Sequence, residues 1–378
     1  MPVTVSALAN SWNSRRDLIK IRLVPADHDA AGHYRCFFPA KALNEELLWD
    51  VQDAEHELVD VRDEGNPLLD TKYVYDIGDI DADTDLMVLH SYMNPNIREV
   101  VRVRRLRGVR RVYMLDDWIM NPPSWNPANR GIKNKWFLPA VVNVCHGAIA
   151  STPFIAEKME QWNKNVRLIR NYLYWPMWEE ATQQSEVDRD GRIRVGYMGS
   201  WAWRQGDLEL LKGVVPRLLR RNPNVDFVAA SATPGAIHDY LGVPEDRRVS
   251  VEGFSFVNNY QRLHTLMQFD IGLIPLATHE FNEAKSHLKG LEYNACGVPF
   301  VASNSESYRY YTIDGENGVR IKPRKKTKTA NQWLEAIESL VHDDDARRVM
   351  GRRGREVAKA NDLALHWNEW AEAYRSIA

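Results

Sequence analysis

The amino-acid sequence predicts an α/β protein of two domains, each built around a parallel sheet. Its 378 residues are too many for one ordinary core and enough for two. Both halves alternate short apolar runs with longer amphipathic segments, and strands bounded by helix-length segments indicate βαβ units. Residues 271–275 are apolar at consecutive positions, as is typical of a strand that helices cover on both faces.

The apolar runs place the strands along the chain. In the first half we expect strands at residues 19–24, 86–90, 111–115, 147–150 and 166–169. In the second half we expect them at residues 194–198, 225–230, 249–251, 271–275 and 299–302. Helical patterns lie between them, for example at residues 34–48 and 97–106. Residues 363–377 have helical apolar spacing and two tryptophans, which indicates a final helix that packs onto another part of the chain.

A polar stretch separates the two halves. Residues 181–192 (ATQQSEVDRDGR) have no apolar period and contain Gly191, as is typical of a linker. We therefore predict a first domain at residues 1–182 and a second at residues 183–360, followed by a final helix at residues 361–378.

Composition limits the class of protein. Hydrophobic residues make up 44% and charged residues 26%, the balance of a soluble globular protein. The formal net charge of −2 gives the molecule no general attraction to nucleic acid or membrane. Three widely spaced cysteines, Cys36, Cys145 and Cys296, form no metal-binding or disulfide pattern. With no secretory signal and no bilayer-length apolar run, these features predict a cytoplasmic protein.

One helical segment combines a cationic start with a later carboxylate. In residues 285–299 (KSHLKGLEYNACGVP), a helix starting near Ser286 would be capped by its hydroxyl and would end at Gly297. Helical spacing would then place Lys285, Lys289 and Glu292 on one face. A helix start with a free lysine can bind phosphate, and a carboxylate two turns later can accept hydrogen bonds from a ribose. A solvated Lys/Glu stripe is the alternative that this segment alone leaves open.

Several segments together carry a family resemblance. Residues 285–299 resemble the signature of retaining GT-B glycosyltransferases similar to family GT4. Residues 195–207 (VGYMGSWAWRQGD) look like that family's strand, glycine loop and helix start, with Arg204 in the place of a phosphate-binding basic residue. Residues 249–255 (VSVEGFS) are similar to the segment beside the base, and residues 151–157 and 169–171 to the end of the first domain. The resemblance therefore spans most of the chain and is strongest from residue 194 to residue 303.

The resemblance implies a donor site on the second domain. It implies a nucleotide-diphosphate sugar, such as a UDP- or GDP-sugar, with Arg204 and Lys285 on the diphosphate and Glu292 on the ribose. Because charge develops on the leaving diphosphate, Arg204 and Lys285 are also expected to contribute to catalysis. The other donor-binding residues implied are Gly199, Ser200, Gly253, Phe254, Ser255, Ser286 and His287.

The family resemblance also implies features of the whole enzyme. It implies two Rossmann-like domains facing a cleft, a final helix that crosses back to the first domain, retention of configuration and no required metal. The acceptor would be a hydroxyl of a glycan, a lipid-linked molecule or a protein. The chain departs from the family pattern at Ala284, where the family often has a glutamate; Glu280 and Glu283 are nearby but out of register. The identity of the transferred sugar is therefore not predicted.

The first domain offers candidate residues at two turns. Gly32 lies where the first strand joins a helix, and with Arg35 it resembles a Gly-x-Tyr-Arg turn that faces donor phosphate and acceptor in some GT-B enzymes. A tight turn at Gly32 and a structural role for Arg35 are the alternatives. Asp116 and Asp117 follow a strand, where parallel sheets bind ligands, and we expect one to face the ligand and the other to cap a helix.

Two other kinds of protein remain open from the sequence. A sugar-nucleotide epimerase or hydrolase would need His90 or Asp117 as its acid or base. A non-catalytic nucleic-acid or glycan-binding protein would use the seven arginines between Arg98 and Arg111. We favour an ordinary solvated face for this arginine segment, with peripheral membrane contact at most and no nucleic acid as partner.

Overall fold

The computed structural model describes residues 20–25, 30–47, 50–53, 58–59, 74–75, 85–91, 109–131, 135–179, 191–252, 268–322 and 326–378. Contacts within the chain divide it into two units. Unit 1 comprises Met1–Met120, Arg130–Arg170 and Leu363–Ala378, and unit 2 comprises Asn121–Asn129 and Asn171–Asp362. Each unit contains one parallel six-stranded sheet, which confirms the predicted α/β class with two sheets.

The sheet of unit 1 has the strand order β2-β1-β5-β6-β7-β8. Its strands are β1 (Lys20–Val24), β2 (Asp50–Asp53), β5 (Leu86–His90), β6 (Arg110–Leu115), β7 (Gly147–Ala150) and β8 (Val166–Leu168). The unit also contains a two-stranded antiparallel sheet of β3 (Leu58–Val59) and β4 (Val74–Tyr75), and the helices α2 (Ala30–Gly32), η1 (His33–Phe37), α3 (Phe38–Leu47), η3 (Lys135–Phe137), α6 (Leu138–Val144), α7 (Pro153–Glu160), η7 (Leu363–Leu365) and α17 (Trp367–Ile377).

The sheet of unit 2 has the order β11-β10-β9-β12-β13-β14. Its strands are β9 (Ile193–Met198), β10 (Val225–Ala230), β11 (Arg248–Val251), β12 (Ile271–Ile274), β13 (Phe300–Ser303) and β14 (Gly318–Ile321). The order runs outward in both directions from β9 and β12, which makes this neighbouring pair the switch point of the sheet, the place where such folds bind ligands.

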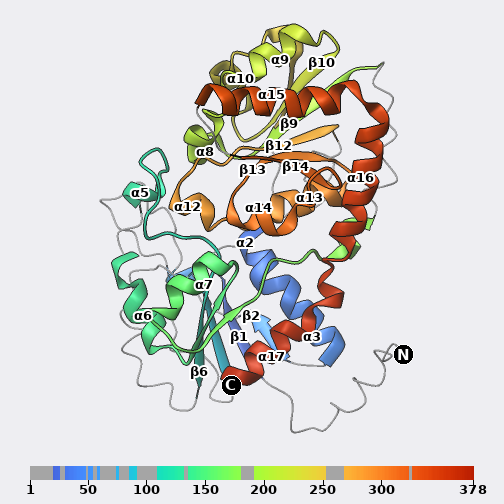
Figure 1. Ribbon diagram of the computed structural model, residues 1–378. Coiled ribbons are helices and arrows are strands. Elements are labelled where there is room, and N and C mark those ends of the chain that lie inside the picture. Colours follow the sequence, from blue (N-terminus) through green and yellow to red (C-terminus); the bar gives the residue numbers. More distant parts are fainter. Residues whose placement is uncertain are drawn as a thin grey trace. The chain divides into compact units, whose positions relative to one another are not determined.

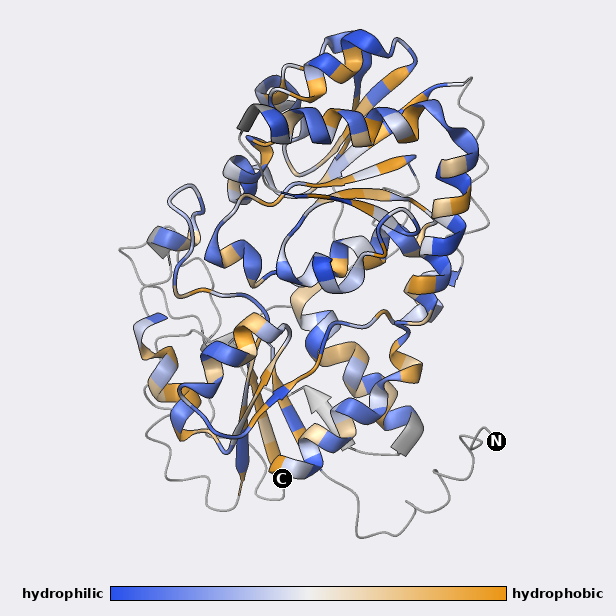
Figure 2. Cartoon of the chain, in the orientation of Figure 1, coloured by the Kyte–Doolittle hydropathy of each residue, from blue (hydrophilic) through white to orange (hydrophobic). Residues whose placement is uncertain are grey.

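Helices cover both faces of the second sheet (Figure 1). The helices described in unit 2 are η4 (Trp175–Met177), α8 (Trp201–Leu208), α9 (Val215–Arg221), α10 (Pro234–Leu241), η6 (Glu245–Arg247), α12 (Glu280–Glu283), α13 (Leu288–Ala295), α14 (Glu306–Tyr311), α15 (Lys326–His342) and α16 (Asp344–Lys359). One core joins the strands to α9, α10 and α15, with Phe227, Leu218 and Trp333 buried in it. Strands are largely hydrophobic, whereas α15 and α16 alternate hydrophobic and hydrophilic residues, as expected for helices with one solvated face (Figure 2).

A buried arginine holds the last helix in unit 1. The Arg35 side chain is fully buried, and its guanidinium carbon lies 4.7 Å from the ring centre of Trp370 on α17. Its Nη1 donates to the carbonyl oxygens of Ile169, at 2.7 Å, and Arg170, at 3.3 Å. Helix α17 also packs against α3 and β6. Arg35 therefore joins η1, α17 and the segment after β8, which is the structural role that the sequence left open for it.

A short segment from the first half of the sequence packs within unit 2. It is the stretch Asn121–Asn129, and the Trp125 indole lies on Gly206 of α8, where an added Cβ would be 2.3 Å from the ring. Asn126 Nδ2 donates to the carbonyl oxygen of Trp203 at 3.4 Å, and Asn121 Nδ2 donates to Glu280 Oε2 at 3.0 Å. Gly206 is thus required for close contact with an aromatic ring.

All ten predicted strands are confirmed, with ends that differ by one residue at most. Strands β2 and β14, an edge strand of each sheet, were not predicted, and neither was the two-stranded sheet of β3 and β4. The predicted helix at residues 97–106 and most of the predicted linker at residues 181–192 lie outside the described residues. Among the described helices, none has the length and apolarity needed to span a membrane.

Candidate functional site

The switch point of unit 2 brings two predicted segments together. Strands β9 and β12 pair in parallel, with Val195 opposite Ile271, so their carboxyl ends lie at one edge. The chain leaves β9 through Gly199 and Ser200 into α8, and it leaves β12 through a loop and the short helix α12, which lead to Lys285. Residues far apart in the sequence therefore meet at this edge because of the strand order.

Arg204 and Lys285 lie at the same aromatic ring. The guanidinium carbon of Arg204 on α8 is 5.8 Å from the ring centre of Phe281, and Lys285 Nζ is 4.5 Å from it. Both residues are partly exposed, whereas Phe281 is buried. The two cationic residues predicted to bind phosphate are thus brought together, on a hydrophobic side chain that favours their positive charge.

The glycine loop before α8 is held closely. The Gly199 N–H donates to the carbonyl oxygen of Ala230 at 3.0 Å, and an added Cβ would lie 2.6 Å from the Tyr197 hydroxyl. Lys289 donates to the carbonyl oxygen of Met198 at the end of β9 and lies 5.2 Å from the Tyr197 ring centre. Ser200 is exposed at the N-cap of α8 without a side-chain cap. A side chain at position 199 would therefore disturb the loop.

The start of α13 differs from its prediction. The helix begins at Leu288, and its N-cap is His287, so Ser286 does not cap it. The Ser286 hydroxyl instead accepts a hydrogen bond from Asn171 Nδ2 at 3.1 Å. His287 is buried and stacks on Tyr311 with ring centres 4.8 Å apart. The expectation that Lys285 shares a helix face with Lys289 and Glu292 is wrong, because Lys285 precedes the helix.

Glu292 is fully buried in the middle of α13. Burial raises the pKa of Tyr308, the nearby Glu292 carboxylate raises it further, and Arg204 opposes this effect. Both charged residues are therefore close enough to influence the same phenol. A ribose could reach the Glu292 carboxylate only after a local shift that exposes it.

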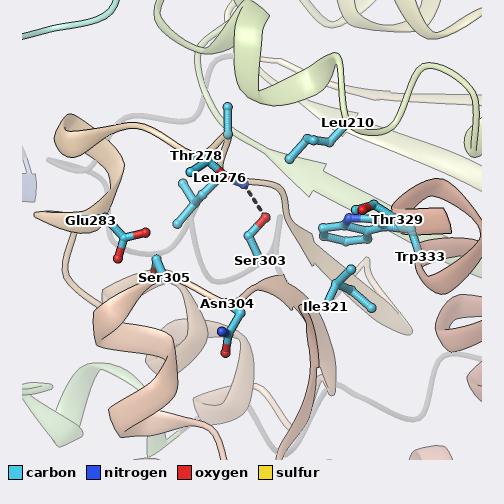
Figure 3. A pocket seen from close by; sticks show the side chains of 11 residues that line it. Leu210, Leu276, Thr278, Glu283, Ser303, Asn304, Ser305, Ile321, Thr329 and Trp333 are labelled. Atoms are coloured by element: carbon cyan, nitrogen blue, oxygen red, sulfur yellow. Dashed lines mark hydrogen bonds between the residues drawn. The ribbon is translucent and has the colours of Figure 1, made fainter. Parts of the chain in front are cut away.

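A pocket is lined in part by the loop that follows β12 (Figure 3). Ser303 Oγ accepts from the Leu276 N–H at 2.9 Å on its wall. The Glu283 carboxylate accepts from the Glu306 N–H at 3.0 Å, at the start of α14, whereas Ala284 is fully buried. The lining residues are Leu210, Leu276, Ala277, Thr278, Glu283, Ser303, Asn304, Ser305, Ile321, Thr329 and Trp333.

In unit 1, Asp116 follows β6 and pairs with the end of β5. Its Oδ1 accepts from Ser91 Oγ at 2.6 Å and lies 3.3 Å from His90 Nε2. Burial raises the pKa of Asp116, but His90, Ser91 and Arg35 outweigh burial and hold this pKa below its usual range. Burial lowers the pKa of His90, but Cys36 and Asp116 raise it to about 10. Ser91 has a positive φ of 44°, a conformation that costs backbone energy.

The remaining predicted residues of unit 1 are placed as follows. Asp117 is half-buried beside Asp116. Gly32 is buried and has helical dihedral angles, φ −59° and ψ −43°, so it lies in a helix and not in the turn expected from the sequence. His90 is fully buried, so a role as the acid or base of an epimerase would need its exposure.

Some predictions lie outside the described residues. They include Gly253, Phe254 and Ser255, expected beside the base, and the arginine segment up to residue 108. Arg110 and Arg111 begin β6. Over the described part of the chain, no group of three or more His, Cys, Asp or Glu side chains is arranged to hold a metal ion.

Sequence reasoning missed one residue of the site, Asp207. It lies one helical turn after Arg204 on α8 and is almost fully buried. Its position three residues after a predicted phosphate-binding arginine was the available signal, because residues at this spacing share a helix face.

The second unit matches a known family by sequence. Residues 192–343 match the family described as glycosyl transferases group 1. No curated protein matches the chain by sequence.

Solved structures share the fold. HepE from Anabaena, solved in complex with UDP-glucose, has a TM-score of 0.65 and 13% identity, with 95% of this chain and 100% of that chain covered. Sucrose-phosphate synthase from Thermosynechococcus elongatus has a TM-score of 0.60 and 18% identity, with 78% and 74% covered. A UDP-forming α,α-trehalose-phosphate synthase from Burkholderia xenovorans has a TM-score of 0.56 and 14% identity, with 79% and 75% covered.

These similarities agree with the two parallel sheets. Residues 192–343 form a glycosyl transferases group 1 domain, and the chain is a glycosyltransferase with the GT-B fold.

Proposed function

We propose that unit 2 binds a nucleotide-diphosphate sugar and that the enzyme transfers the sugar to a hydroxyl acceptor. The observation that carries this proposal is the convergence of Arg204 and Lys285 on Phe281 at the switch point. Two cations at the carboxyl edge of a Rossmann-like sheet suit a diphosphate, because ligands of such sheets bind at this place. The solved complex of HepE with UDP-glucose has the same fold and supports a nucleotide-sugar donor.

The cations act on the leaving group in this proposal. The bond between the sugar C1 and the diphosphate oxygen breaks, and a bond from C1 to the acceptor oxygen forms. Negative charge increases on the diphosphate as its bond breaks, and Arg204 and Lys285 stabilise that charge. The acceptor proton goes to a leaving phosphate oxygen on the same face, so configuration is retained. Because protein cations neutralise the diphosphate, the proposed mechanism has no required metal ion.

The other donor residues extend this site. The Gly199 and Ser200 loop and the segment with Ser286 and His287 flank the phosphates, and Glu292 binds the ribose after a local shift. Gly253, Phe254 and Ser255 would contact a uracil or guanine base.

Unit 1 is proposed to bind the acceptor, through Gly32 and the carboxyl edge with Asp116 and Asp117. The acceptor class is a glycan, a lipid-linked molecule or a protein hydroxyl. The family resemblance supports this division of roles, and we place the enzyme in the cytoplasm. The arginine segment between Arg98 and Arg111 would at most touch a membrane surface.

A thermal-shift panel tests the donor proposal. We expect UDP- or GDP-sugars to raise the melting temperature of the wild type, because a ligand that binds the folded state stabilises it by mass action. The panel also includes dTDP- and CDP-sugars. Transfer to candidate acceptors is then measured as the nucleoside diphosphate that is released. No shift with any of the four nucleotide classes would overturn the donor assignment.

A further inference from the structure

Asp207 is a buried carboxylate with partners on two elements. Its Oδ1 accepts from the Ala277 N–H at 2.8 Å and from Asn282 Nδ2 at 2.6 Å, and both donors belong to the segment after β12. Its Oδ2 lies 3.4 Å from Arg204 Nη1, within α8. The side chain of Asp207 is only 2% exposed, so these contacts rather than water satisfy its charge.

The segment that Asp207 holds leads directly to the second cation. Asn282 Nδ2 also donates to the Ala277 carbonyl oxygen at 2.9 Å, which closes the loop on itself. The Lys285 N–H donates to the Asn282 carbonyl oxygen at 3.2 Å. Phe281, which contacts both cations, lies next to Asn282. One carboxylate thus links the helix that carries Arg204 to the segment that carries Phe281, on α12, and Lys285.

From this arrangement we infer that Asp207 is a positioning residue for the donor diphosphate: it fixes Arg204 and Lys285 at the spacing that binds both phosphates. The inference rests on the proposed function and adds a residue that touches no substrate. Ala277, whose N–H Asp207 accepts, is also one of the residues that line the pocket after β12.

The variant D207N keeps the shape of the side chain and breaks the arrangement. If the amide oxygen faces Ala277 and Asn282, the amide nitrogen faces the Arg204 guanidinium, donor against donor. If the amide is flipped, its nitrogen faces the two loop donors instead. In either orientation a buried donor loses its acceptor and Arg204 loses its counter-ion.

The matched control is D226N. Asp226 is also a buried carboxylate in unit 2, paired with Arg192 and, at 3.4 Å, with Arg247, but it lies at the start of β10, away from the carboxyl edge. Both variants remove a carboxylate paired with arginine. Only D207N removes one that is linked to the proposed phosphate site.

The experiment is calorimetric titration of the full-length protein and both variants with UDP, GDP, uridine and guanosine. For the diphosphate that binds the wild type, we expect D207N to weaken binding about tenfold or more, which is about 1.4 kcal/mol. We expect the parent nucleoside to bind D207N within about twofold of the wild type, and D226N to bind both like the wild type. A purely structural role would affect nucleoside and diphosphate alike.

Different results identify which proposal fails. If the wild type binds a diphosphate and D207N binds it as tightly, the positioning role is wrong and the donor site stands. If the wild type binds neither diphosphate, the donor site itself fails and the role of Asp207 fails with it. If D207N does not fold, N282A removes one partner of Asp207 without leaving an unpaired charge, and a selective loss of diphosphate affinity is again expected.

Discussion

Arg204 and Lys285 place their cationic groups against one ring, that of Phe281, at 5.8 Å and 4.5 Å from its centre. They come from elements on either side of the switch point, α8 after β9 and the loop after β12. The aromatic ring therefore gives both charges a shared and partly dehydrated surface, on which an anion is bound more strongly than in open water.

Removal of either cation is expected to weaken diphosphate binding selectively. R204A and K285A should each lose about 2 kcal/mol of binding free energy for the nucleoside diphosphate, because each removes one charged contact. K212A is the matched control, since Lys212 Nζ lies 4.4 Å from the Tyr240 ring centre in the same unit but outside the cluster. Calorimetric titration of the three variants measures this. Equal loss in K212A would contradict the assigned site.

Glu292 is expected to affect the nucleoside part of the donor. E292Q keeps the volume of a fully buried side chain but weakens it as an acceptor for ribose hydroxyls. We expect about tenfold weaker binding of both the nucleoside and its diphosphate, unlike K285A, which should spare the nucleoside. Titration with uridine or guanosine distinguishes the two. Unchanged nucleoside affinity with a lower melting temperature would show that Glu292 is structural.

The pair of His90 and Asp116 should make stability depend on pH. The pKa of His90 is raised from 6.5 to about 10 in the folded protein, so its stabilisation is complete below pH 6.5 and is lost as pH rises toward 10. The pKa of Asp116 is lowered from 3.8, so its stabilisation is present above that value and is lost as pH falls further. H90Q should therefore lower the free energy of unfolding by about 3 kcal/mol near pH 6 and by progressively less toward pH 10.

Unfolding of the wild type and H90Q at pH 6, 8 and 10 measures the gap between their free energies of unfolding. H146Q is the control, because burial and the neighbouring Arg111 and Arg110 lower the pKa of His146 instead of raising it. The difference in free energy of unfolding between the wild type and H146Q should therefore not shrink as pH rises. A gap for H90Q that stays constant from pH 6 to pH 10 would mean that His90 is neutral in the folded protein.

The glycine loop allows a test by suppression. G199A should destabilise the protein by about 2 kcal/mol, because the new Cβ would lie 2.6 Å from the Tyr197 hydroxyl. Adding Y197F removes that hydroxyl and should restore part of the loss. In the helical control G235A, no atom lies within 4 Å of the added Cβ, so a small gain is expected. Thermal unfolding of G199A, the double variant and G235A beside the wild type shows whether the G199A loss comes from this contact; no recovery in the double variant would exclude it.

The sequence was sufficient for ten of the twelve strands of the two sheets and less so for the helix starts, and the phosphate-binding roles of Arg204 and Lys285 stay predictions. Strands buried on both faces leave an apolar run that can be read directly, as at residues 271–275, whereas the edge strands β2 and β14 lack such a run. Ser286 was expected to cap α13, but its hydroxyl accepts a hydrogen bond from Asn171, which is 115 residues away in the sequence. A local sequence pattern does not show such a distant partner. Asp207 was missed for the same reason, because its partners Ala277 and Asn282 are distant in the sequence.

The packing of Trp125 on Gly206 bears on how the protein can be divided for experiments. Unit 2 draws Asn121–Asn129 from the first half of the chain, and unit 1 draws Leu363–Ala378 from its end. A fragment of residues 171–362 would therefore expose the surface of α8 that Trp125 covers at Gly206, two residues after Arg204. Neither unit can be excised as one uninterrupted stretch, so a donor half produced on its own must carry its tryptophan segment as a grafted extension.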